Sequence, residues 1–230
     1  MSTDTDHNTH TNNDAIILSV DSLKFSWRLG RTMKAYLIGI AADNLGTLQI
    51  TESLTSTRIK HRPILGRPFS WPLGHDGFVL YQRTGGLPDV VRYSLVIVRD
   101  RFTARKVGSI LKKIAADQEF KQIVRTATTL AAGAAGANVA LGLLAPAMGV
   151  VGRVLREMND KVLDTIDGGL HLDRADKLQS EFSDTVRSAI ADVELDFHLF
   201  DAAVDEDSAA FLHGSLVGLQ ESGLLIGTEA

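Results

Sequence analysis

Residues 192–199 read DVELDFHL, and this stretch decides the fold. Apolar and polar residues alternate strictly along it, which is the period of a β-strand with one face buried and the other in solvent. The apolar face carries Val193, Leu195, Phe197 and Leu199, whereas the polar face is acidic. Such half-buried strands are typical of antiparallel sheets that pack one face on a core. The stretch therefore predicts antiparallel β-structure.

The same alternation recurs earlier in the chain. Leu23, Phe25 and Trp27 alternate with Lys24 and Ser26, and the turn signal around residues 43–46 separates two further apolar runs. Together the strand candidates before residue 100 are Leu23–Trp27, Lys34–Ile40, Thr47–Thr51, Gly77–Gln82 and Val90–Val98. Two more candidates, Val162–Ile166 and Leu170–Leu172, flank the pair Gly168-Gly169. Many short strands with turns between them indicate a sandwich or barrel rather than alternating strands and helices.

Between these two groups of strands the apolar period changes to that of a helix. Thr103 is a suitable N-cap, and apolar residues then recur at helical spacing as far as Ile114. The apolar face changes phase near Asp117, which predicts two helices rather than one. A third stripe runs from Leu141 to Met158, with Pro146 at its start or at a kink.

The predicted fold class is α+β: an antiparallel β-sandwich of seven or eight strands interrupted by an α-helical insertion at about residues 103–158. The strands on either side of the insertion must pair for the core to close. Residues 1–14 are polar and lack Lys and Arg, so they predict a disordered tail rather than a signal peptide. Residues 15–207 form the single predicted domain, and residues 208–230 give no definite pattern.

The charges are divided unevenly along the chain. The net charge is only −4. Residues 15–125 nevertheless carry 18 bases and 8 acids, whereas residues 126–230 carry 6 bases and 17 acids. A basic front half can indicate an anionic partner. If one sandwich contains both halves, part of this asymmetry becomes pairing within the molecule.

Residues 126–152 contain no charged residue, and 9 of the 27 are alanine. One helix of this length would more than span a ~30 Å hydrocarbon core. Ala and Gly, however, contribute little to membrane insertion. Three interpretations are therefore possible: a hairpin packed on the sandwich or on a partner, a segment that enters a bilayer conditionally, and a transmembrane helix. The candidate residues for hairpin packing or insertion are Ala132, Gly136, Ala140, Leu141, Leu144 and Met148.

A basic and proline-rich stretch follows Arg58. Prolines at positions 63, 68 and 72 exclude regular strand pairing, so it is predicted to be a loop. Its cations and aromatic residues suit anionic headgroups, single strands of nucleic acid, or a solvated loop whose Trp caps the core. The candidate membrane or anion-binding residues are Arg58, Lys60, Arg62, Arg67, Phe69 and Trp71.

No catalytic pattern is present. The segment His213–Gly218 does not have the spacing of a nucleophile elbow, and no Gly-Lys-Ser/Thr follows Gly133–Gly136. The chain has no Cys, which excludes disulfides, thiolate metal sites and a cysteine nucleophile. We therefore expect a protein that is not an enzyme and has no cofactor.

Three stretches resemble the calcium- and lipid-binding β-sandwich, the C-two-type domain. Ile17–Lys24 is similar to its first strand, Met33–Ile38 to a later motif and strand, and Tyr93–Asp100 to the strand that leads into a calcium loop. The resemblance implies metal ligands at Asp21 and Asp100, but Lys34 fills an expected acidic position. Two carboxylates seldom suffice for calcium, so the resemblance implies a member that does not depend on calcium.

Two functional hypotheses follow. The leading one is a non-enzymatic module that docks on an anionic membrane surface, with the Ala/Gly-rich hairpin inserting or oligomerising. The alternative is a soluble scaffold or protein-interaction protein that assembles into homo-oligomers through its basic and acidic halves. Nucleic acid is not the expected partner. The expected location is the cytoplasm, with peripheral attachment to a membrane under the leading hypothesis.

Overall fold

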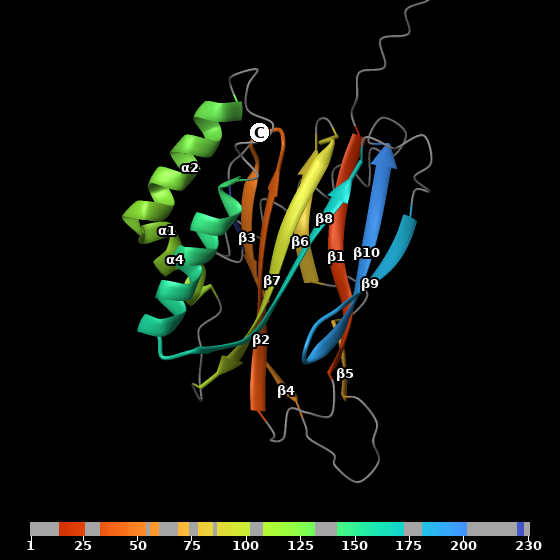
Figure 1. The fold of residues 1–230 in the computed structure, drawn as a ribbon, viewed down its shortest axis with the longest axis vertical. Coiled ribbons are helices and arrows are strands. Elements are labelled where there is room, and N and C mark those ends of the chain that lie inside the picture. The colour runs from red at the N-terminus through yellow and green to blue at the C-terminus, as the bar shows by residue number, and fades with distance from the viewer. Residues whose placement is uncertain are drawn as a thin grey trace, which may run out of the picture.

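The computed structural model describes residues 14–25, 33–53, 56–59, 69–73, 78–84, 87–101, 108–131, 142–172, 181–201 and 225–227. Within them the chain forms two antiparallel sheets and a layer of helices (Figure 1). The α+β sandwich with a helical insertion is confirmed. It has more strands than the expected seven or eight, because several strands are too short to give an alternating pattern.

The first sheet, sheet A, has β1 and β10 at its centre. β1 (Asp14–Phe25) pairs with β10 (Ala191–Asp201) on one side and with β5 (Phe69–Pro72) and β6 (Phe78–Thr84) on the other. β9 (Glu181–Arg187) pairs with the far side of β10. The alternating stretch 192–199 lies in β10, and its Val193 and Leu195 are buried as predicted. Asp14, which the sequence assigned to the tail, begins β1.

The second sheet, sheet B, is built around β2 (Met33–Asp43) and β7 (Val90–Asp100). On one side of β2 lie β3 (Leu48–Glu52) and β4 (Thr57–Ile59), and β11 (Leu225–Gly227) pairs with β3. On the far side of β7 lies β8 (Lys161–His171), the first strand after the insertion. The expected pairing across the insertion is therefore confirmed.

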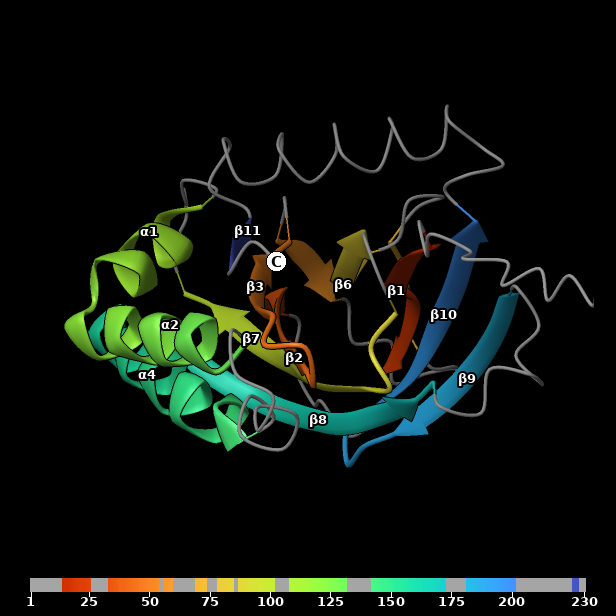
Figure 2. The same cartoon turned by 90° about the horizontal axis from the view of Figure 1, so that it is seen from above.

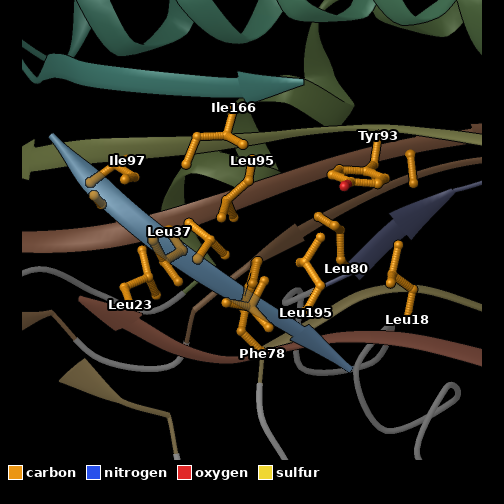
Figure 3. Packing of buried hydrophobic residues seen from close by; sticks show 14 of the residues in the cluster. Leu18, Leu23, Leu37, Phe78, Leu80, Tyr93, Leu95, Ile97, Ile166 and Leu195 are labelled. Carbon is orange, nitrogen blue, oxygen red and sulfur yellow. The ribbon is translucent and has the colours of Figure 1, made fainter. Parts of the chain in front are cut away.

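The main core lies between the two sheets. Side chains from the inner faces of both sheets interdigitate there, as alternation along each strand requires (Figure 3). Residues 37, 95 and 97 of sheet B face residues 18, 23 and 195 of sheet A in this core. All are apolar, which is why the period-2 pattern could be seen in the sequence.

The helices cover the outer face of sheet B, so the molecule has three layers (Figure 2). They are α1 (Ser109–Ala116), α2 (Gln118–Ala131) and α4 (Leu144–Glu157). Their apolar faces form a second core with the outward residues of β2, β3 and β7, among them Tyr36, Ile38 and Val96. The predicted change of phase at Asp117 is the break between α1 and α2. Pro146 lies in the first turn of α4, where no helical N–H bond is lost.

β8 corrects one expectation. The sequence suggested two strands flanking Gly168-Gly169, but β8 is continuous through both glycines. Gly168 pairs with Tyr93, whose ring lies against the glycine backbone: a Cβ added there would lie 2.2 Å from the Tyr93 hydroxyl oxygen. The glycine therefore makes room for a cross-strand aromatic ring rather than for a turn.

Asp43 ties the two sheets together where β2 ends. Its fully buried carboxylate accepts hydrogen bonds from the backbone N–H of Leu45 (2.9 Å) and Thr47 (2.7 Å), which fix the turn into β3. It also accepts bonds from the Tyr81 hydroxyl (2.6 Å) and the Arg83 guanidinium (3.1 Å), both on β6 of sheet A. Burial, and next the charge of Asp43, raise the pKa of Tyr81 well above its ordinary value.

We expect Tyr81→Phe to lower the free energy of unfolding by about 1.5–3 kcal/mol, because a bond to a buried carboxylate is lost. A raised pKa in the folded state means that Tyr81 contributes stability below about pH 10 that is lost as the pH rises further. Urea unfolding from about pH 8 to pH 11 measures both effects. Tyr81→Phe should lose less stability over this range than the parent chain; an equal loss would contradict the assignment.

Candidate functional site

Cations gather at one end of sheet B, at the lower end of the molecule in Figure 1. We call this the basic end and define it as Lys34, Arg58, Arg99, Arg101 and Lys161. Lys34 is the second residue of β2, and Arg58 lies in β4. Arg99 and Arg101 lie near and just past the end of β7, and Lys161 begins β8. The side chains of residues 58, 101 and 161 are exposed, and those of residues 34 and 99 are half-buried.

Like charges oppose each other across the strands of the basic end. Arg58 pairs with Lys34 between β4 and β2, and Arg99 pairs with Lys161 between β7 and β8. Directly opposed side chains have Cβ atoms only about 4.5–5.5 Å apart, and like charges at that separation are destabilising. Asp100 is the cross-strand neighbour of Lys34 on its other side. Within the described part of the chain, none of these four cations forms an ion pair.

A β-bulge creates the second of these pairs. The register runs from Ile97 opposite Asp164 to Val98 opposite Val162, so Leu163 is an extra residue without a partner. Without the extra residue, the register of residues 164–171 would continue along β8 and place Lys161 opposite Asp100. The bulge instead places it opposite Arg99. The fold therefore gives up a favourable cross-strand pair for a repulsive one.

The junction between α4 and β8 holds the basic end in place. Asp160 is buried, and its carboxylate accepts bonds from the Tyr36 hydroxyl (2.8 Å) and the Arg101 backbone N–H (3.3 Å). Asn159, whose φ of 58° is left-handed, accepts a 3.1 Å bond from the Arg101 guanidinium. These bonds connect the end of α4, the end of β7 and the start of β8, so the positions of Arg101 and Lys161 are fixed by the fold.

The structure corrects the expectation that the proline-rich stretch lacks regular strand pairing, because residues 69–72 form β5 and pair with β1. Of the alternatives left open for Trp71, the structure favours the one in which it caps the core. Trp71 is only 4% exposed and stacks on Phe25, with ring centroids 6.4 Å apart. Phe69 is half-buried against the same ring. The indole of Trp71 thus belongs to the core and is not placed to contact a headgroup. Of the cations predicted with it, Arg58 belongs to the basic end, whereas residues Lys60, Arg62 and Arg67 lie outside the described residues.

The described part of the uncharged stretch packs on the sandwich. Leu144 and Met148 are half-buried and contact the core between the helices and sheet B. The other residues predicted for hairpin packing or insertion lie outside the described residues; they are Ala132, Gly136, Ala140 and Leu141. None of the helices in the described part is long and apolar enough to cross a membrane.

The two metal ligands implied by the resemblance are not brought together. Asp21 lies in the middle of β1 in sheet A, and Asp100 ends β7 in sheet B. Asp100 is buried and lies opposite Lys34. Over the ranges that the structure describes, no group of three His, Asp or Glu side chains is arranged to hold a metal ion.

Part of the charge asymmetry is pairing within the molecule, as the sequence suggested. On the outer face of sheet A, Glu194 accepts bonds from Lys24 and Ser22, and the bond from Lys24 is the main cause of its lowered pKa. Asp192 lies 3.9 Å from the Arg187 guanidinium. The acidic face of β10 is therefore partly neutralised, whereas no described acid forms an ion pair with the cross-strand cations of the basic end.

Most residues of the basic end were not singled out from the sequence. Arg58 was, because it begins the proline-rich stretch, but Lys34 was noted only as a departure from a calcium-ligand position. Arg99 and Arg101 flank Asp100 in one segment, and Lys161 lies in a distant one. Only the register of β2, β7 and β8 brings them together, and no local pattern encodes that register.

No family model matches the chain, and no curated protein matches it either. Eight chains of known structure match. One is described as "Structure of Drosophila C2-DSL-EGF1"; it is 10% identical and aligns with a TM-score of 0.35 over 81% of this chain and 67% of that chain. A TM-score of this size supports no conclusion about fold or function. The resemblance to the C-two-type domain thus stays a prediction.

We expect Trp71→Ala to lower the free energy of unfolding by about 3–5 kcal/mol, because it removes a large buried ring. Arg58→Ala, on an exposed side chain nearby, should change it by no more than about 0.5 kcal/mol. Urea denaturation compares the two variants. A small effect of Trp71→Ala would mean that the indole lies at the surface instead of in the core.

Proposed function

We propose that the protein is a non-enzymatic module that docks on an anionic membrane surface through the basic end. The observation that carries the proposal is the two pairs of opposed cations, Arg58 with Lys34 and Arg99 with Lys161, none of which forms an ion pair with a described acid. A bound anion would relieve the repulsion within each pair. Each base near an anionic bilayer adds about 1 kcal/mol of attraction.

The repulsive pair of Arg99 and Lys161 at the bulge supports a binding role for this end of the sheet. Natural sequences are consistent from local to global structure, and departures concentrate at functional sites. Here the alternative register would pair Lys161 with Asp100, and the observed register opposes it to Arg99. A bulge that costs stability and concentrates positive charge favours binding of an anion at this end.

Docking does not require the uncharged stretch to enter the bilayer. Leu144 and Met148 contribute to the core between the helices and sheet B, so drawing α4 into a membrane would expose that core. The Ala/Gly-rich segment remains a candidate for insertion or oligomerisation in its undescribed part. The proposal rests on the basic end alone.

Self-assembly as a soluble scaffold is the second candidate function. It would use the acidic outer face of β10 as the partner of the basic end. Glu194 and Asp192 are already engaged by Lys24 and Arg187 of their own chain, which leaves less negative charge for a second copy. We therefore place it behind membrane docking.

We expect the protein to float with vesicles that contain phosphatidylserine, with or without calcium, and to be released as salt screens the charges. Vesicles of phosphatidylcholine alone are the control. Absence of flotation at low salt would refute membrane docking. In that case, salt-sensitive oligomers seen by light scattering of the protein without lipid would favour the scaffold.

Lys161→Glu separates stability from binding. It turns the repulsive pair with Arg99 into an attractive one, so we expect it to raise stability by roughly 0.5–1 kcal/mol, or about 2 °C in melting temperature. The same change removes positive charge from the basic end and should weaken binding to anionic vesicles about tenfold or more.

Lys121→Glu is the matched control for this variant, because it makes the same charge change on the exposed face of α2, away from any strand. It should neither stabilise the fold nor change vesicle binding by more than about twofold. Equal loss of binding in both variants would mean that net charge, rather than the basic end, drives association.

A further inference from the structure

We infer, on the basis of the docking proposed above, that the sandwich stands end-on upon the bilayer and that Val162 enters the interface. The strands of sheet B would then run away from the membrane, with the basic end in the headgroup region. This assigns one residue as the apolar anchor and fixes the orientation of the whole domain.

Val162 is an exposed apolar side chain at the basic end. It is 37% exposed and follows Lys161 directly, next to the strand that carries Arg99 and leads into Arg101. An apolar group close to bases at one end of a domain is the composition of interfacial anchors, which combine apolar burial with attraction to anionic lipid. Half-buried Met33 and Phe69, at the first residues of β2 and β5, add apolar surface at the same end.

The bulge explains why Val162 is exposed. If the register of residues 164–171 continued without the bulge, Val162 would lie opposite Arg99 on the face that looks toward sheet A. The extra residue turns Leu163 toward the sandwich core and leaves Val162 opposite Val98 in β8, the last strand of the described sheet B. One irregularity thus produces both the opposed cations and the exposed valine beside them.

The helical face offers a competing orientation. Lys112, Lys113, Lys121 and Arg125 are exposed on α1 and α2, and side-on docking would place them against the bilayer. Between them lie polar side chains such as Gln118 and Gln122. Among the described residues, the exposed large apolar side chains are those of Val162 and Leu45. The described helices therefore present no exposed large apolar side chain to a bilayer. Charge alone would allow either orientation, and the apolar anchor favours the end-on one.

Leu45 is a natural control within the same chain. It is 38% exposed, nearly the same as Val162, but lies in the turn after β2, at the opposite end of sheet B. The ten residues from Lys34 to Asp43 span about 30 Å at the rise of a strand. A probe on Leu45 should therefore stay in water when one on Val162 contacts lipid.

The chain contains no Cys, so single-cysteine variants can be labelled at one site each. The experiment places a polarity-sensitive fluorophore at Val162→Cys, Leu45→Cys and Lys121→Cys, with vesicles of phosphatidylserine and phosphatidylcholine. We expect a blue shift, and quenching by lipid-borne quenchers, at position 162 and at neither other position. A shift at position 121 would show side-on docking, and a shift at position 45 would show that the other end docks; each overturns the inference.

Binding without insertion is separable from no binding. Cosedimentation of the labelled proteins reports binding itself: vesicle binding without any shift at position 162 overturns the inference and leaves membrane docking intact. No cosedimentation refutes both. As an independent measure, Val162→Ser should weaken partitioning about threefold to fivefold, whereas Leu45→Ser should leave it unchanged. Equal effects of the two substitutions would also overturn the inference.

Discussion

The pairing of β7 with β8 is the contact on which the rest of the structure depends. The two strands are separated in the chain by the whole helical insertion, yet they pair over ten residues of β7 from Val90 to Arg99. Because the chain leaves sheet B at the end of β7 and returns to it at β8, the helices between them fold back onto the outer face of that sheet. That return path gives three layers and buries the face of β2 and β7 that looks away from sheet A.

The same pairing sets the chemistry of the surface. A sandwich with a well-filled core tolerates a small local cost at a strand edge, since an opposed like-charged pair costs only about 0.2–1 kcal/mol. The buried bonds of Asp43 and Asp160 hold the ends of β2, β7 and β8 in fixed positions. Repulsion between Arg99 and Lys161 therefore remains as an exposed concentration of charge and cannot relax by a shift of the strands.

Elements with a long, clear period could be predicted from the sequence. The strands β7 and β10, the apolar stripes of the helices and the break at Asp117 follow from one face of each element being buried. Strands β4, β5 and β11 could not be predicted, because three or four residues give no period and they form only by adding to a neighbour. The sequence divided β8 into two strands at Gly168-Gly169, because the need for a glycine beneath the Tyr93 ring arises only once β7 and β8 are paired.

The sequence by itself determined the fold class, the place of the helical insertion and the excess of bases in the front half of the chain. It also marked Arg58 as a candidate for anion binding. Only the tertiary structure decided that Trp71 belongs to the core and that Lys34, Arg99 and Lys161 lie at one end of one sheet. The physical reason is that a cross-strand neighbour is set by register, and a single extra residue at Leu163 changes which side chain Lys161 opposes.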